Sequence, residues 1–411
     1  MPLSSQFCRR PGLALAVAVV CALGISRRVY AETPVKIGVL TDMSGIYADL
    51  SGKGSIVAAR LAIEDFSLKY PDRLKVELIS ADHQNKSDVG AAIARRWLDT
   101  EGVNAIVDLP ASAVALAVSD IGAQKNAAIL VSAGVAESLT NAVCRPTTVQ
   151  WTYDTYALSH GAVRALAGSG AKNWFFVTGN FVAAREMEAE SIEELKAAGG
   201  SAVGSVRVPL GTPDFASFLL QAQSSKAQLI AILAPGDDLV NATKQARDFG
   251  IAANGQRIAA LIAYISDVHA MGLEIAQGIT LVTAFYWDRD EGSRSFSKRF
   301  SAKLPGRMPT MVQAGVYSVV LNYLLAVNAV GSASDGKRVV DQMKGRDIVD
   351  PLFGNVRVAS NGRAFHDMYL VEVKKPSESR YPWDYYSIKS VIPAEKAFRP
   401  VAESKCPLVA N

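Results

Sequence analysis

Residues 35–66 read VKIGVLTDMSGIYADLSGKGSIVAARLAIEDF, and this stretch decides the fold of the chain. The apolar run at 35–40 predicts a strand, and a polar, glycine-rich loop follows it. A helix comes next, because apolar residues then recur at the spacing of one helical face, namely Ile56, Ala59, Ile63 and Phe66. A strand, a loop and a helix in this order are the repeating unit of an α/β protein.

The glycine and lysine cluster in this loop does not match a nucleotide-binding motif. A Walker loop needs a glycine five residues before the second one, where this chain has Tyr47, and it needs a hydroxyl after Lys53, where the chain has Gly54. A dinucleotide turn needs a third glycine where the chain has Val57. The loop instead suits the presentation of backbone N–H groups and a helix N-terminus to a bound group. A plain strand-to-helix connection is the alternative.

The same alternation continues through most of the chain. Predicted strands lie at 35–41, 75–81, 105–108, 128–132, 173–178, 202–208, 229–233, 259–263 and 279–283. Helical stretches separate them, for example at 87–101, 112–125, 184–198 and 237–249. This order predicts right-handed crossovers and mostly parallel sheets with helices on their faces. The apolar stretch at 312–330 carries two tyrosines and two asparagines, which favours a buried helix over a membrane span.

Three breaks in the alternation, at 144–156, 283–290 and 350–355, predict a chain that crosses three times between two lobes. Ligands of open α/β sheets sit beyond the carboxyl ends of the strands, so a single site is expected in the cleft between the lobes. The expected limits are 32–151 plus 286–355 for lobe 1, 152–285 plus 356–373 for lobe 2, and 374–411 for a C-terminal tail that wraps the surface.

Residues 1–31 have the pattern of an export signal. Arginines precede an apolar core at 13–25, and an A-x-A-like site ends at Ala31, so cleavage is expected there and the mature protein in the periplasm. Arg27 and Arg28 behind the core leave a retained anchor open as an alternative.

The charge balance argues against nucleic acid and anionic membranes as partners. The full chain has 43 basic and 39 acidic residues, but 1–31 contain four arginines and no acid. The remaining 380 residues therefore carry a net charge of zero, and no basic field remains to attract nucleic acid or an anionic membrane. A chain of 380 residues is longer than the chains that usually fold around a single hydrophobic core, which agrees with two lobes.

The cysteines and histidines indicate no metal and no catalytic thiol. Cys144 and Cys406 are the cysteines that remain after cleavage, and in an exported chain they form either a disulfide or two buried free thiols. The four histidines show no metal-ligand spacing, and there is no G-x-S-x-G elbow. Ser112, at a predicted helix start, is more simply an N-cap than a nucleophile. No cofactor, no metal and no enzymatic activity are therefore expected.

Several segments in order resemble one family. They are VKIGVLTDMSG at 35–45, AARLAIED at 58–65, the region 105–112, ILVSAG at 129–134 and FASFLLQAQ at 215–223. Together they resemble the leucine/isoleucine/valine-type extracytoplasmic solute-binding proteins, which are receptors of ABC importers with the type I periplasmic-binding fold. The resemblance covers nearly all of the mature chain. It implies a two-lobed protein that closes by hinge bending on a small-molecule ligand and is then recognised by a permease in the inner membrane.

The resemblance also implies a set of ligand-binding residues at strand ends and crossovers. Family members grip a ligand carboxylate with a serine at a helix start and with groups after the next strand, which match Ser112 and Ala133-Gly134. The complete predicted set is Tyr47, Leu50, Ser112, Ala133, Gly134, Tyr153, Phe181, Asp237, Tyr264 and Tyr286. About half of the aromatic residues at these breaks are expected to pack between the lobes instead.

One departure from the family bears on the ligand. An acid that pairs with the ligand ammonium should follow the strand at 259–263, where this chain has Tyr264-Ile265-Ser266 and then Asp267. Burial of an unpaired ammonium is costly, so the sequence favours a small organic acid, and aromatic side chains with polar tips favour an aromatic carboxylate. The alternatives are an amino acid paired with Asp237, Asp238 or Asp267, a ligand-sensing module, and an exported enzyme on the same scaffold. A monomer is expected.

Overall fold

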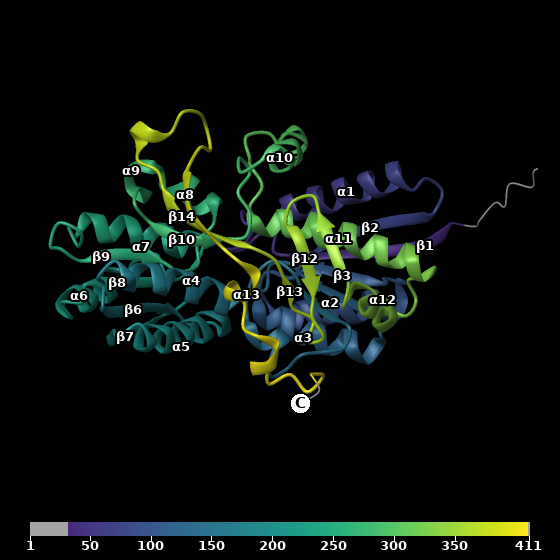
Figure 1. The fold of residues 1–411 in the computed structure, drawn as a ribbon, viewed down its shortest axis with the longest axis horizontal. Helices are drawn as coiled ribbons and strands as arrows, with labels where there is room; N and C mark the ends of the chain where they lie inside the picture. The colour runs from purple at the N-terminus through teal and green to yellow at the C-terminus, as the bar shows by residue number, and fades with distance from the viewer. Residues whose placement is uncertain (1–31, 410–411) are drawn as a thin grey trace, which may run out of the picture. The chain divides into compact units, whose positions relative to one another are not determined.

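The computed structural model describes residues 32–409, which form a mixed α/β protein (Figure 1). The predicted export signal at 1–31, with its cleavage site, lies outside the described residues. Two parallel sheets carry helices on their faces, as predicted, and two smaller antiparallel sheets accompany them. We call the part built on the first parallel sheet the first lobe and the part built on the second parallel sheet the second lobe.

The sheet of the first lobe is parallel throughout and has the strand order β2-β1-β3-β4-β5. Its strands are β1 (Thr33–Thr41), β2 (Leu74–Asp82), β3 (Ala105–Asp108), β4 (Ala128–Val131) and β5 (Thr148–Gln150). The intervening helices are α1 (Gly52–Lys69), α2 (Ser87–Thr100), α3 (Ser112–Lys125) and the short η1 (Glu137–Thr140). Every residue of β3 and β4 is buried, as expected for strands covered on both faces. Strand β5 lies inside a stretch that the sequence marks only as a break.

The parallel sheet of the second lobe has the order β7-β6-β8-β9. Its strands are β6 (Asn173–Gly179), β7 (Ser201–Val208), β8 (Leu229–Leu233) and β9 (Arg257–Ala260). Its helices are α4 (Thr155–Gly168), α5 (Val182–Ala197), α6 (Ala216–Ser224), α7 (Asp237–Asp248), α8 (Ile265–Met271) and α9 (Leu273–Ala276). The side chain of Asp154 caps α4 by accepting the backbone N–H of Ala157 at 2.8 Å, which starts this lobe immediately after the first crossover.

The remaining elements build the two antiparallel sheets and the last helices. One sheet pairs β10 (Thr280–Thr283), β14 (Met368–Val373) and β15 (Tyr386–Ile392), and the other pairs β11 (Asp347–Asp350), β12 (Gly354–Val358) and β13 (Ala364–Phe365). The helical segments are α10 (Glu291–Lys303), α11 (Met311–Val330), α12 (Gly336–Met343), η2 (Pro376–Glu378), α13 (Ala394–Ala397) and η3 (Val401–Glu403).

The strand pairing moves two expected lobe limits. Strand β12 pairs with β11, β13 pairs with β12, and Arg363 bridges to Gln150 of β5, so residues 354–365 join the first lobe and not the second. The stretch after 373 is not only a surface tail, because β15 pairs with β14. Hydrogen bonding of the backbone decides both corrections, since each edge strand takes the partner that satisfies its N–H and C=O groups. We propose that the third crossover lies at 366–367.

Helix α11 is long and apolar enough to cross a membrane, but most of it is buried inside the protein. It packs along α1, and its Thr310 N-cap and Gln313 form a reciprocal capping box. It is the buried core helix that the sequence predicts.

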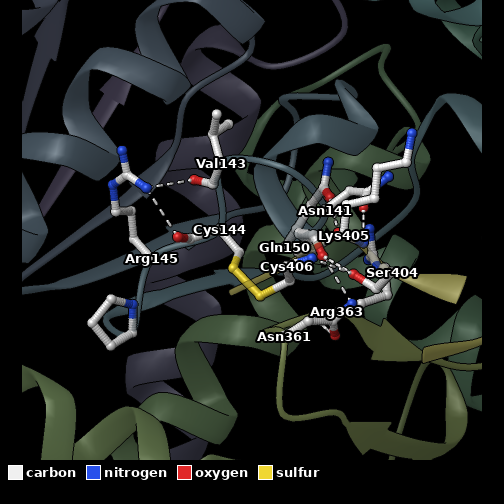
Figure 2. Close-up of a disulfide and its surroundings, with 12 residues drawn as sticks. Asn141, Val143, Cys144, Arg145, Gln150, Asn361, Arg363, Ser404, Lys405 and Cys406 are labelled. Atoms are coloured by element: carbon white, nitrogen blue, oxygen red, sulfur yellow. Dashed lines mark hydrogen bonds between the residues drawn. A yellow bond between two sulfur atoms is a disulfide. The ribbon is translucent and has the colours of Figure 1, made fainter. Parts of the chain in front are cut away.

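A disulfide between Cys144 and Cys406 ties the end of the chain to the first lobe (Figure 2). Their Cα atoms lie 5.6 Å apart although 262 residues separate them in sequence. Because β15 belongs to a sheet of the second lobe, the chain returns to the first lobe after β15. The structure thus adds a fourth passage between the lobes to the three predicted crossovers.

Candidate functional site

The candidate site lies where strands of both parallel sheets end. Parallel strands present their carboxyl ends at one edge of a sheet, so the loops after β1, β3 and β4 gather in the first lobe. The loop after β9, which contains Tyr264, approaches them from the second lobe. The two lobes are in direct contact, because a Cβ on Gly236 would lie 2.7 Å from the carbonyl oxygen of Ile46.

Asp42 organises the loop after β1. Its buried carboxylate accepts the backbone N–H groups of Gly45 at 2.8 Å and of Tyr47 at 3.2 Å. These donors point into the protein, so the expectation that the loop presents them to a ligand is wrong for these residues. Tyr47 and Leu50 are themselves buried, and the Leu50 carbonyl accepts the hydroxyl of Thr310 at 2.6 Å.

Ser112 is the first residue of α3, and Ala111 occupies the N-cap, so the interpretation of Ser112 as an N-cap is wrong. Its Oγ accepts the backbone N–H of Ala136 at 3.2 Å and thereby ties α3 to the loop after β4. Gly134 in that loop must be glycine, because a Cβ would lie 2.9 Å from the Leu109 carbonyl. The first-turn N–H groups of α3 have no acceptor within the helix and remain suited to a carboxylate.

Tyr153 and Tyr264 join the two lobes. Tyr153 donates its hydroxyl to the Ala133 carbonyl at 3.1 Å and accepts the hydroxyl of Tyr264 at 2.8 Å. Burial raises the pKa of both hydroxyls well above the usual value, so both stay protonated in the physiological pH range. Tyr47 lies close enough to influence the pKa of both. The structure thus brings Tyr47, Ala133, Tyr153 and Tyr264 together, and their contact with a ligand stays a prediction.

Three predicted residues take no part in the hydrogen bonds of this group. Phe181 is half-buried at the N-cap of α5, and Asp237 is exposed in the first turn of α7. Tyr286 packs in the core of the second lobe, with its ring 5.2 Å from that of Tyr386 and its hydroxyl 3.4 Å from the carboxylate of Asp384. Its aromatic ring serves packing, so the structure does not support a ligand-binding role for Tyr286.

Two of the three acids that the sequence offers as ammonium partners are already bonded to the backbone. Asp267 accepts the N–H of Tyr264 at 3.0 Å, and Asp238 accepts the N–H of Gly211 at 3.0 Å. Both side chains are buried, and burial raises the pKa of Asp267 to about 7. Both carboxylates are thus engaged by backbone donors and buried, whereas Asp237, the third acid that the sequence offers, is exposed.

A cavity of about 270 Å³ adjoins the site. Both lobes line it, with Ala48, Asp49, Lys53, Gly54, Arg307 and Gln313 from the first and Ser266 and Trp383 from the second, together with Met43, Leu304 and Met308. Its lining includes neighbours of Tyr47, Leu50 and Tyr264. Lys53 and Arg307 contribute cationic groups to this lining and Asp49 an anionic one, with Arg307 paired to Asp49 at 3.1 Å.

Asp108 also lies in this region, although the sequence pattern did not predict a role for it. It ends β3 in the left-handed backbone region, with φ at 88°, and its side chain is fully buried. Ser132 donates to its Oδ1 at 3.3 Å, while Oδ2 has no hydrogen-bond partner among residues 32–409. The signal in the sequence that could have identified it is an acidic residue at the end of an otherwise apolar strand. Burial raises the pKa of Asp108 to about 6 despite the hydroxyls around it.

Replacement of Asp108 by asparagine should change how stability depends on pH. A carboxyl whose pKa is raised in the folded state favours folding below its unfolded pKa near 4, and that contribution disappears as the pH rises through about 6. We expect Asp108→Asn to match the native protein near pH 4 and to exceed it by about 2–3 kcal/mol at pH 7. Urea unfolding at several pH values measures the difference.

The matched control is Asp248→Asn, at an exposed carboxylate that ends α7. It should leave the pH dependence of the unfolding free energy unchanged. Parallel curves for Asp108→Asn and the native protein across pH 4–7 would contradict the assignment.

Comparison with known proteins shows the family and the fold of this chain. The chain matches the model of the periplasmic binding protein family over residues 34–379. It is similar to a crystal structure of a periplasmic binding protein from Burkholderia mallei, with 43% identity, 92% of this chain and 99% of that chain covered, and a TM-score of 0.87. It is also similar to a branched chain amino acid ABC transporter periplasmic ligand-binding protein from Burkholderia xenovorans LB400, with 41% identity, coverage of 91% and 99%, and a TM-score of 0.81.

A curated relative agrees with this placement. The Leu/Ile/Val-binding protein homolog 6 of Brucella melitensis is 26% identical over 378 residues, which are 90% of this chain and 94% of that protein. The family consists of solute-binding receptors that work with membrane permeases and are exported to the periplasm. The chain therefore belongs to the periplasmic binding protein family and is a periplasmic binding protein of the Leu/Ile/Val type that serves ABC transporters.

Proposed function

We propose that this receptor binds a small organic acid, with an aromatic carboxylate favoured, between its lobes and delivers it to the permease of an ABC importer. It does so as a monomer and without chemical turnover of the ligand. The observation that carries the proposal is Tyr264, which stands where the resemblance to amino-acid receptors leads us to expect an acid, and whose hydroxyl is bonded to Tyr153 at 2.8 Å.

The environment of Tyr264 disfavours an α-amino group. Removing an ammonium from water without a paired anion costs several kcal/mol. Asp267 and Asp238 already accept backbone N–H groups and are buried, so neither presents an exposed carboxylate to a ligand ammonium in this arrangement. A ligand that lacks the ammonium avoids this cost.

The other groups suit a planar carboxylate. The start of α3 at Ser112 and the loop that contains Ala133 offer backbone dipoles for an anion. Tyr47, Tyr153 and Tyr264 are buried, and we propose that their rings and neutral hydroxyls contact an apolar ring with polar substituents.

Solved proteins of the same fold guide the choice of test ligands. A solute-binding protein from Rhodopseudomonas palustris BisB5 was solved with 3,4-dihydroxy benzoic acid, and another from R. palustris with 4-hydroxybenzoate. They are 21% and 20% identical to this chain, so the likeness concerns the fold alone. The more similar B. xenovorans protein is described as belonging to a branched chain amino acid transporter.

A thermal-shift panel tests the proposal directly. It contains benzoate- and cinnamate-type acids, branched and aromatic amino acids, short fatty and dicarboxylic acids, and sugars. A ligand that binds the folded state at a hundred times its Kd adds about 2.7 kcal/mol to the unfolding free energy. We expect organic acids to raise the melting temperature and amino acids to leave it unchanged.

Tyr264→Ala should weaken binding of the acid that gives the largest shift by at least about tenfold, because a ring and a hydroxyl of the site are lost. Isothermal titration calorimetry measures Kd. Tyr286→Phe is the matched control, since Tyr286 packs in the second lobe and should leave Kd unchanged. Equal Kd values for Tyr264→Ala and the native protein would contradict the placement of the ligand.

The second candidate is an amino-acid receptor that uses Asp237. Its exposure in the first turn of α7 and the relative named above favour this reading. A thermal shift with amino acids alone would establish it and would refute the organic acid. A ligand recovered chemically changed would instead establish an enzyme.

A further inference from the structure

We propose that residues 393–406, which we call the strap, form a brace across the hinge that holds the two lobes closed through a single arginine, Arg399. This inference concerns closure itself and does not depend on which ligand is bound.

The strap begins on the second lobe and ends on the first. Ile392, the last residue of β15, packs on Gly161 of α4. The backbone N–H of Ala394 then binds the carboxylate of Asp367 at 3.0 Å, beside the third crossover. At its far end the disulfide joins Cys406 to Cys144 of the first lobe.

The far end of the strap is held firmly on the first lobe (Figure 2). The hydroxyl of Ser404 donates to the Thr140 carbonyl at 3.2 Å, and the backbone N–H of Lys405 binds the side chain of Asn141 at 2.5 Å. The covalent bond and these contacts fix the far end to the first lobe, while Ile392 and Ala394 hold the near end on the second lobe and the third crossover. Any change in the angle between the lobes must therefore be absorbed by the residues between the two ends.

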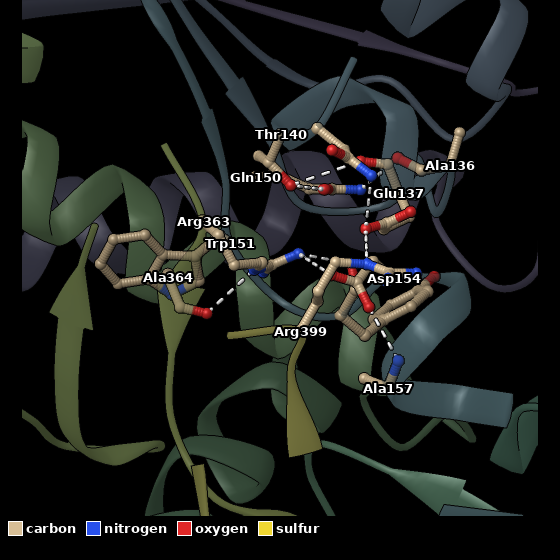
Figure 3. Close-up of polar contacts among 12 residues, drawn as sticks. Ala136, Glu137, Thr140, Gln150, Trp151, Asp154, Ala157, Arg363, Ala364 and Arg399 are labelled. Carbon is tan, nitrogen blue, oxygen red and sulfur yellow. Dashed lines mark hydrogen bonds and ion pairs between the residues drawn. The ribbon is translucent and has the colours of Figure 1, made fainter. Parts of the chain in front are cut away.

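Arg399 occupies the middle of the strap and contacts both lobes at once. Its Nε donates to Glu137 of η1 at 2.5 Å, and its Nη2 donates to Glu190 of α5 at 2.6 Å. Glu137 belongs to the first lobe and Glu190 to the second. The guanidinium also lies over the ring of Tyr156, 4.7 Å from its centroid. Figure 3 shows Arg399 approaching Glu137 next to the buried pair Asp154 and Arg363.

The bridge is well shielded from solvent, which distinguishes it from a surface ion pair. The side chains of Glu137 and Glu190 are 11% and 13% exposed, and that of Arg399 is 22% exposed. Charged hydrogen bonds in such surroundings are roughly twice as strong as neutral ones. A second contact runs parallel to it, since Ser138 of η1 donates its hydroxyl to Glu186 of α5 at 2.7 Å.

Geometry connects this bridge with opening of the cleft. Glu137 directly follows the loop 132–136, which contains Ala133 and Gly134, so η1 moves with that part of the candidate site. Asp154 and Arg363, at the first crossover and just before the third, adjoin the bridge. Opening about these crossovers turns η1 away from α5. One guanidinium cannot then keep both carboxylates, so the bridge favours the closed arrangement.

The test measures the distance between the lobes without any ligand. Nitroxide labels are placed on the exposed positions Arg95→Cys in α2 and Gln221→Cys in α6, and the native disulfide stays oxidised. Double electron–electron resonance then gives the distribution of distances between the two labels. We expect Arg399→Gln to raise the ratio of open to closed molecules about tenfold, which corresponds to about 1.4 kcal/mol.

Arg164→Gln is the matched control. Arg164 pairs with Glu194 on the same helix as Glu190, but both residues belong to the second lobe. It should leave the distance distribution unchanged, whereas Cys144→Ser combined with Cys406→Ser should shift it in the same direction as Arg399→Gln. Arg399→Lys, which reaches one carboxylate, should give a smaller shift and serves as the second variant if Arg399→Gln fails to unfold cooperatively.

Two results would overturn the proposal. One is an Arg399→Gln distribution that coincides with that of the native protein. The other is an equal shift for Arg164→Gln and Arg399→Gln, since it would mean that loss of any arginine paired with a glutamate of α5 loosens the lobes. Because no ligand takes part, neither result bears on the proposed organic acid.

Discussion

Replacing Arg363 by methionine is expected to lower the free energy of unfolding by about 3–5 kcal/mol, because it leaves a buried carboxylate without its partner. The side chains of Arg363 and Asp154 are each 2% exposed, and Nη1 of the arginine lies 3.5 Å from Oδ2 of Asp154. Nη1 also donates to the Tyr153 carbonyl at 2.8 Å. Nε donates to the Ala364 carbonyl at 3.0 Å (Figure 3). One substitution therefore removes several buried contacts at the first and third crossovers.

Removal of one partner of this pair is expected to lower the free energy of unfolding more than removal of both partners. Burial lowers the pKa of Arg363 to about 10 and raises the pKa of Asp154, so both charges are held against their desolvation. Removal of both charges leaves none uncompensated. Asp154→Asn combined with Arg363→Met should accordingly be less destabilised than Arg363→Met alone.

Urea unfolding followed by circular dichroism at pH 7 measures these differences. Arg357→Met is the matched control, since Arg357 is exposed on β12 and stacks on the ring of Phe365 at 5.0 Å. Its loss should be below about 1 kcal/mol, as for other exposed charges. A loss of the same size for Arg363→Met would show that the buried pair contributes little.

Removal of the disulfide by Cys144→Ser with Cys406→Ser is expected to lower the free energy of unfolding by about 4–5 kcal/mol. The bond closes a loop of 262 residues, and long loops restrict the unfolded chain most in the chain-entropy account. Both cysteines are buried, at 2% and 3% exposure, so the native bond is protected from solution thiols until the tail opens.

Urea unfolding with and without dithiothreitol tests this prediction. Dithiothreitol should destabilise the native protein to the level of the double-serine variant and should have no effect on that variant. A difference below about 1 kcal/mol between oxidised and reduced native protein would contradict the chain-entropy account for this bond. It would mean that the unfolded chain is already restricted in other ways.

The predicted ligand-binding residues show what local sequence patterns can and cannot predict. The loop after β1 and the tyrosines at 153 and 264 were predicted as ligand contacts because each follows a predicted strand or marks a break. Tyr286 met the same criterion and yet packs in the second-lobe core. A break in periodicity locates a crossover, but the direction of a side chain there depends on elements that are distant in sequence.

Buried polar residues were the least visible from sequence. Asp108 closes an apolar strand, and Arg363 and Arg399 lie in irregular segments near the end of the chain. No local period marks them, because their partners Asp154, Glu137 and Glu190 stand about 200 or more residues away. Charged residues in loops are usually solvated, so burial of these particular ones could be learned only from the assembled lobes.

The sequence by itself determined the α/β class, the alternation of strands and helices, the expected cleft and the resemblance to solute-binding receptors. These follow from apolar periodicity and from local turn and loop signals, which act over a few residues. Tertiary structure alone decided the pairing of β12 and β13 with the first lobe, the closure of the disulfide, and the bridge from Arg399 to both lobes. Each of these depends on contacts between segments far apart in the chain, and such contacts form only once the lobes have packed.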